Sequence, residues 1–156
     1  MSALLEINNL KTRFYTQDGV VKAVNSISYS LNEKEIIAVV GESGSGKSVS
    51  MLSILGLVPI PPGRIEEGKA IYKGKDLLTL SNEQLRNVRG REISMIFQDT
   101  MTSLNPVFSI GFQIKEALRE NQKKKKKQAQ KRAIELLEIV GVPSAADRVN
   151  NYPHQF

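Results

Sequence analysis

The sequence has no cysteine, no tryptophan and a single histidine among its 156 residues. Without cysteine the chain can form no disulfide framework and no thiolate metal site, which fits a reducing cytoplasm. It also has no run of about 18 apolar residues, so we expect no membrane span. The N-terminus enters strand-like sequence directly, and we therefore expect no secretory signal. With 40% hydrophobic and 24% charged residues, the composition is that of a globular domain.

Positive charge is in excess but concentrated in one place. The net charge is +6, and subtracting the five lysines of Lys123–Lys127 leaves +1 for the rest of the chain. A lysine run without an interleaved aromatic residue usually belongs to a solvated helix face or a mobile connection. If the run does bind a partner, anionic lipid headgroups and phosphate backbones are the candidates.

One stretch matches the phosphate-binding pattern Gly-x-x-x-x-Gly-Lys-Ser/Thr, and it reads Gly41-Glu42-Ser43-Gly44-Ser45-Gly46-Lys47-Ser48. Glycines let successive backbone N–H groups wrap a triphosphate closely. Lys47 would reach the β- and γ-phosphates, and the Ser48 hydroxyl would ligate Mg²⁺. Val49 completes the predicted nucleotide-binding set. The alternative is a glycine-rich linker before a helix.

Both flanks of this stretch support phosphate binding. The apolar run Ile36–Val40 predicts a buried strand before the loop. A helix is expected after Gly46, with Met51–Leu57 packing on the sheet, because free N–H donors at a helix N-terminus favour an anion.

The residues before the loop predict an antiparallel layer. Leu4–Phe14 alternates, with Leu5, Ile7 and Asn9 expected on one face and Leu10 on the other. Asp18-Gly19 predicts a hairpin turn, followed by strand over 20–24 and 27–31.

The residues after the loop predict further elements. The proline-rich segment 58–63 excludes regular structure, and 68–77 predicts a strand and a turn. Ser81 with Gln84 predicts a helix cap, and Glu92–Phe97 predicts another buried strand.

Helical spacing follows over 111–120 and 128–140, where Ala133, Ile134, Leu137 and Val140 share a face, and Gly141 and Pro143 end the second helix. The fold class expected is α/β, with an antiparallel β layer, a partial parallel core and the start of a helical lobe.

Three segments together resemble one family, namely the loop Gly41–Ser48, the block Met95–Pro106, which contains Phe97-Gln98-Asp99, and the tail Tyr152–Phe156. They are similar to the ATP-binding subunit of ABC importers of the dipeptide, oligopeptide and nickel group. The resemblance implies a P-loop NTPase fold of ABC type, with a nucleotide-binding core over 1–98 and a Q-loop and helical subdomain over 99–156.

The resemblance also implies roles for single residues. Gln98 is expected to be the Q-loop glutamine, which offers its amide oxygen to Mg²⁺. Phe14 is expected to stack on adenine, with Tyr15 as a rival because stacking needs only a π-face. Thr100 departs from the proline common in the family, which would loosen the Q-loop. His154 is expected to be structural.

The implied cofactors are ATP and Mg²⁺. The implied partners are the transmembrane permease subunits and a second ATP-binding subunit packed head to tail, at the cytoplasmic face of the membrane. No nucleic-acid partner is expected.

The sequence stops where the family's signature motif would start, at Phe156. We therefore expect this chain to bind nucleotide without hydrolysing it, and an open sheet edge to leave it marginally stable. The alternatives are a non-hydrolytic nucleotide-binding or interaction fragment and, less favoured, a nucleic-acid-binding protein acting through Lys123–Lys127.

Overall fold

The computed structural model describes residues 3–98, 103–123 and 125–156. The chain forms two compact units, Met1–Arg86 and Asn87–Phe156, which are described separately below. This division falls earlier than the functional boundary expected after Gln98, and that functional division stays a prediction.

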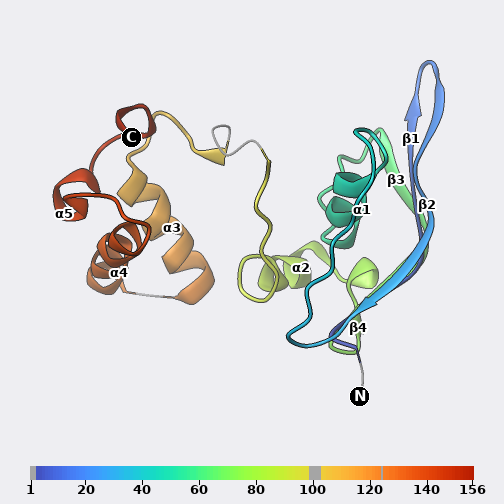
Figure 1. Cartoon of the computed structure of the whole chain (residues 1–156), viewed down its shortest axis with the longest axis horizontal. Helices are drawn as coiled ribbons and strands as arrows, with labels where there is room; N and C mark the ends of the chain where they lie inside the picture. Colours follow the sequence, from blue (N-terminus) through green and yellow to red (C-terminus); the bar gives the residue numbers. More distant parts are fainter. Residues whose placement is uncertain (1–2, 99–102, 124) are drawn as a thin grey trace. The chain divides into compact units, whose positions relative to one another are not determined.

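The first unit is built on an antiparallel sheet with the strand order β2-β1-β3-β4 (Figure 1). The strands are β1 (Leu5–Thr16), β2 (Gly19–Leu31), β3 (Gly63–Tyr72) and β4 (Lys75–Asp76). Thr16 pairs with Gly19, which confirms the hairpin predicted at Asp18-Gly19. The predicted antiparallel layer is therefore present.

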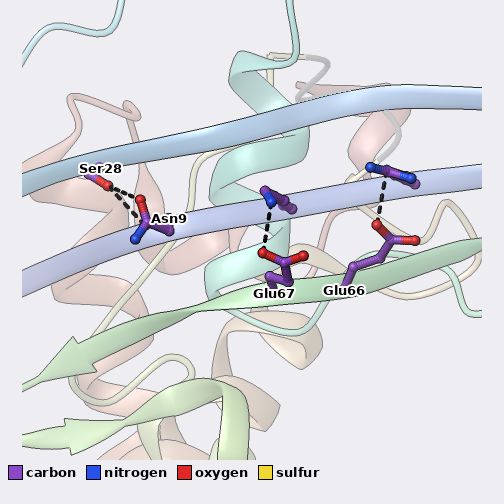
Figure 2. Close-up of polar contacts among 6 residues, drawn as sticks. Asn9, Ser28, Glu66 and Glu67 are labelled. Atoms are coloured by element: carbon purple, nitrogen blue, oxygen red, sulfur yellow. Dashed lines mark hydrogen bonds and ion pairs between the residues drawn. The ribbon is translucent and has the colours of Figure 1, made fainter.

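A bulge in β1 changes which of its residues face inward. Asn9 has a φ of 49°, and the β1–β2 register shifts between Ile7 and Leu10. The Asn9 N–H donates to Ser28 Oγ at 2.8 Å, and the Ser28 hydroxyl donates to Asn9 Oδ1 at 3.3 Å (Figure 2). Ile7 and Leu10 are consequently both fully buried, so the strict alternation expected along this strand was wrong.

Two ion pairs join β1 to β3 (Figure 2). The Lys11 ammonium lies 2.7 Å from a Glu67 carboxylate oxygen, and the Arg13 guanidinium lies 2.9 Å from Glu66. The hydrogen bond from Lys11 lowers the pKa of Glu67. The Lys11–Glu67 pair contributes little to stability because water reaches Glu67, whereas both side chains of the Arg13–Glu66 pair are partly buried.

Helix α1 (Lys47–Ile54) contacts both β1 and β2. The Thr12 and Ser53 hydroxyls, both fully buried, form a 2.8 Å hydrogen bond between strand and helix. Because the Ser53 hydroxyl donates to the Val49 carbonyl at 2.7 Å, Thr12 is the donor to Ser53. This bond joins α1 to the sheet.

Two predicted strands are not formed in the described residues. Ile36–Val40 is not assigned to any strand, with Ile36 96% and Val40 88% exposed, and Ile96 within Glu92–Phe97 is 90% exposed. Neither segment has a sheet partner there beyond an isolated bridge between Arg89 and Ile93. Both strand predictions were wrong because an apolar run becomes a buried strand only where neighbours take its N–H and C=O groups.

The boundary between the units falls within α2 (Asn82–Val88), which follows the short helix η1 (Leu77–Thr79). The Gln84 N–H donates to Ser81 Oγ at 3.3 Å, and the Ser81 N–H donates to Gln84 Oε1 at 2.9 Å. The predicted cap of this helix is confirmed.

The second unit is helical, with α3 (Ile110–Gln122), α4 (Lys126–Ile139), α5 (Ala145–Arg148) and the short η3 (Pro153–Gln155). Its described residues include a large buried apolar cluster: Ile110, Leu118, Ala129, Ala133, Leu137, Ala145 and Val149. No helix in the described ranges is long and apolar enough to cross a membrane.

The end of α4 follows the prediction in part. The Gly141 N–H donates to the Glu138 carbonyl at 2.9 Å with a φ of 79°, so the glycine stop is confirmed. Val140 is 73% exposed, so its predicted place on the buried face was wrong. The reason is that α4 ends at Ile139 and Val140 is its C-cap, while Ala129 supplies the buried position one turn before Ala133.

The hydrogen bond between Thr12 and Ser53 predicts unequal costs for its two partners. Thr12→Val leaves the Ser53 hydroxyl bonded to Val49, so we expect a loss of about 1 kcal/mol, whereas Ser53→Ala leaves a buried donor unpaired and costs about 1–3 kcal/mol. The double variant should cost less than the sum, measured by urea unfolding. Strictly additive costs would contradict this coupling.

Candidate functional site

The loop Gly41–Ser48 leads into α1, as the sequence predicted. Gly41 to Ser45 are exposed, whereas Gly46 and Lys47 are half-buried. The loop therefore presents an open surface that continues into the first turn of a helix.

Gly46 fixes the position of the loop against the sheet. It has a φ of 90°, and a Cβ at this position would lie 2.0 Å from the Ala23 carbonyl oxygen of β2. Only glycine allows both the backbone conformation and the close approach. Gly44 has a φ of 79°, but a Cβ there would meet no atom within 4 Å. The sequence motif identified Gly46, but nothing in it pointed to Ala23 as its neighbour.

The loop and the helix start offer a row of backbone donors. In the described part of the chain, no protein acceptor takes the N–H groups of Gly44, Gly46, Lys47, Ser48 and Val49. Free donors at a helix N-terminus, together with the helix dipole, favour a bound anion. The geometry thus fits a ligand with several phosphate oxygens.

The Lys47 side chain lies across this loop. Its ammonium donates to the carbonyls of Gly41 at 2.6 Å and Glu42 at 2.7 Å, and to Ser45 Oγ at 3.3 Å. These acceptors are all uncharged, so only the donor is ionised, whereas a phosphate oxygen would add the attraction between two opposite charges. Phosphate oxygens at the loop would therefore compete well for this ammonium.

The residues after Lys47 have different environments. Ser48 is exposed in the first turn of α1, while Val49 is half-buried and accepts the Ser53 hydroxyl through its carbonyl. Across the residues that are described, no three His, Cys, Asp or Glu side chains gather into a metal site. A metal at Ser48 would therefore depend on ligand oxygens supplied by phosphates.

Phe14 and Tyr15 lie on opposite faces of the sheet. The pairing of β1 with β3 runs without a bulge from Thr12 to Phe14, which pairs with Gly63. Because side chains two residues apart on a strand share a face, Phe14 lies on the same face as Thr12, the face that contacts α1. Tyr15 lies on the other face, where its hydroxyl donates to Glu66, and this hydrogen bond raises the pKa of Tyr15. Phe14 is half-buried and Tyr15 is exposed.

Gln98 belongs to the second unit and is exposed. The rest of its motif, residues 99–102 with Thr100, lies outside the described residues. Its predicted role toward Mg²⁺ stays a prediction. His154 stacks on Tyr152, with ring centroids 5.9 Å apart.

Gln113 holds the segment after this motif, a role that was not predicted from the sequence. The Gln113 side chain accepts the Asn105 N–H at 2.9 Å and donates to the carbonyls of Asn105 at 2.9 Å and Phe108 at 3.0 Å. A glutamine in the first turn of an amphipathic helix was the only available signal.

Comparisons with known proteins agree on the family and the fold. Residues 24–156 match the ABC transporter family. The chain is 49% identical over 156 residues to the oligopeptide transport ATP-binding protein OppD of Bacillus subtilis, covering 100% of this chain and 44% of that protein. It is 47% identical over 153 residues to the dipeptide transport ATP-binding protein DppD of Escherichia coli. That match covers 98% of this chain and 46% of DppD.

Among solved structures, the chain is similar to the ATP-binding cassette MJ0796 in a dimeric post-hydrolysis state bound to ADP and Pi. The TM-score is 0.81 at 21% identity, covering 97% of this chain and 62% of that one. This likeness shows an α/β cassette fold, as expected from the sequence. The chain spans less than half the length of the two curated relatives.

The contact between Gly46 and Ala23 predicts a difference between two glycine substitutions. Gly44→Ala should cost about 1–2 kcal/mol, from the left-handed backbone alone. Gly46→Ala should cost about 1–3 kcal/mol more, because its Cβ also meets the Ala23 carbonyl. Urea unfolding of both variants measures the two free energies. Equal losses in the free energy of unfolding would show that Gly46 does not lie in close contact with the Ala23 carbonyl of β2.

Proposed function

Because this chain belongs to the ABC transporter family, we propose that it is the ATP-binding part of a peptide importer subunit and binds Mg·ATP through Gly41–Ser48. The observation that carries the proposal is the set of N–H donors left free in the described structure, at Gly44 and from Gly46 to Val49, beside the Lys47 ammonium. The names of the relatives supply the solute class, since they are oligopeptide and dipeptide transport ATP-binding proteins.

The phosphates would be held by backbone and side chain together. The loop N–H groups would donate to the β-phosphate oxygens, and the Lys47 ammonium would exchange the Gly41 and Glu42 carbonyls for the β- and γ-phosphates. Mg²⁺ would neutralise charge on those phosphates. The Ser48 hydroxyl, and Gln98 from the second unit, would be its protein ligands.

Adenine would stack on Phe14. Phe14 shares the sheet face that carries α1, whereas Tyr15 lies on the opposite face and is bonded to Glu66. This arrangement favours Phe14 over its rival.

The partners proposed are the permease subunits of the importer and a second ATP-binding subunit. A dimer of cassettes is supported by the similar MJ0796 structure, which is dimeric and bound to ADP and Pi. The subunit would then work peripherally at the cytoplasmic face of the membrane, coupling nucleotide binding to movement of the permease.

Titration calorimetry with ATP tests the phosphate site. Lys47→Ala should weaken binding about 10- to 100-fold, because it removes charge-assisted hydrogen bonds worth about 1.5–3 kcal/mol. Lys34→Ala, an exposed lysine outside the loop, serves as the control and should bind normally. Ser48→Ala should lose the gain in affinity that Mg²⁺ gives while matching the unaltered protein in EDTA. Normal ATP binding by Lys47→Ala would refute the proposed site.

A second comparison separates Phe14 from Tyr15. Phe14→Leu keeps apolar bulk but removes the ring, so ATP affinity should fall about 5- to 100-fold, the range expected for base stacking of about 1–3 kcal/mol. Affinity for inorganic tripolyphosphate, which has no base, should not change. Tyr15→Leu should alter neither. The reverse pattern would assign stacking to Tyr15.

A further inference from the structure

A basic groove lies between α3 and α4 in the second unit, and none of its lining residues is among those assigned to ATP. It has a volume of about 780 Å³. Its charged lining consists of Lys115, Arg119, Lys126 and Lys127 with two carboxylates, Glu116 and Glu120. This volume is in the range of sites for small ligands.

The cations of this groove are largely unneutralised. The Lys115 ammonium donates to Gln130 Oε1 at 2.7 Å. In contrast, Arg119, Lys126 and Lys127 have no ion pair or hydrogen bond from their side chains within the described ranges, even though Glu116 and Glu120 line the same groove. Lys123, the C-cap of α3, and Lys125, the N-cap of α4, are exposed. Such a surface has strong electrostatic complementarity to an anion.

The order of residues at the start of α4 adds a second observation. Its N-cap is Lys125, its first turn begins Lys126-Lys127, and this turn contains no acidic residue. Lysines at a helix N-terminus oppose the helix dipole, so this order is unfavourable for the isolated helix. An anion bound between these ammonium groups and the start of the helix would reverse the sign of that interaction.

We propose that this basic groove binds the phosphate headgroup of an anionic phospholipid at the membrane surface. The exposed ring of Phe112 also lines the groove and would contact the apolar part of the lipid next to the phosphate. The choice of a membrane lipid over a soluble phosphate ester rests on the proposed function, which places the subunit at a membrane. The site itself rests on the charges and volume of the groove.

Vesicle co-sedimentation tests the proposal. The full chain is mixed with phosphatidylcholine vesicles, with or without phosphatidylglycerol. Each basic residue near an anionic surface contributes about 1 kcal/mol, or about fivefold in partitioning. The triple variant Arg119→Gln, Lys126→Gln, Lys127→Gln should thus bind phosphatidylglycerol vesicles on the order of 100-fold less well. Thermal unfolding confirms that this variant is folded.

A matched control removes the same charge elsewhere. Lys22, Lys34 and Lys75 are exposed lysines of the first unit, and changing all three to Gln should reduce partitioning by less than about fivefold. A double variant, Glu116→Gln with Glu120→Gln, makes the groove more positive instead of less. It should strengthen binding to phosphatidylglycerol vesicles, because it removes the only carboxylates that line the groove among the described residues. Equal losses in the two triples, or no gain from removing the carboxylates, would overturn the proposal.

Two further measurements are needed. One distinguishes a lipid phosphate from a soluble or nucleic-acid phosphate, and the other distinguishes failure of the groove proposal from failure of the proposed function. Groove-dependent binding of soluble glycerol 3-phosphate, or of single-stranded RNA, with no groove-dependent binding to vesicles would overturn a lipid headgroup as the ligand. ATP titration of the groove triple should match the unaltered protein. If the unaltered protein binds vesicles through the groove but does not bind ATP, only the proposed function fails.

Discussion

The packing of α1 on the antiparallel sheet is the interaction on which the nucleotide site depends. The buried bond between Thr12 and Ser53 joins the middle of β1 to the helix, and the close approach of Gly46 to the Ala23 carbonyl fixes the start of the same helix on β2. Because α1 is held to the sheet both at its start and near its end, the free N–H groups of its first turn point in a fixed direction. Lys47 then needs only to rotate away from the Gly41 and Glu42 carbonyls to meet an anion.

Features that depend on a few consecutive residues could be predicted from the sequence. The glycine required at a φ of 90°, the Ser81–Gln84 cap and the stop at Gly141 are local, because each is decided by backbone geometry or by bonds spanning three or four residues. The helix after the phosphate loop follows for the same reason. The loop, the element that follows it and the identity of Lys47 and Ser48 were therefore accessible from residue order alone.

Features that depend on distant partners could not be predicted in this way. Ile36–Val40 has the composition of a buried strand, yet within the described residues no neighbour bonds to it and it is not a strand. The inward position of Leu10 depends on a bulge at Asn9 that Ser28 stabilises from β2. The separation of Phe14 from Tyr15 depends on their register with β3, including Glu66. In each case the deciding atom lies in another segment, which no window along the sequence contains.

The starts of α1 and α4 both place lysines at a helix N-terminus, but the site at α1 is more rigidly built. Each helix begins with lysine and has no acidic residue in its first turn, so each is locally unfavourable unless an anion is bound. At α1 the glycine backbone approaches β2 closely and the ammonium is bonded in place, which suits a ligand of fixed shape. In the groove beside α4, Arg119, Lys126 and Lys127 are long, exposed side chains without side-chain partners in the described structure, and the groove remains open. Such a site selects for charge more than for shape, because flexible ammonium groups lose more entropy on ordering than a preformed loop does. A fluid, anionic surface is a better match for it than a single rigid metabolite.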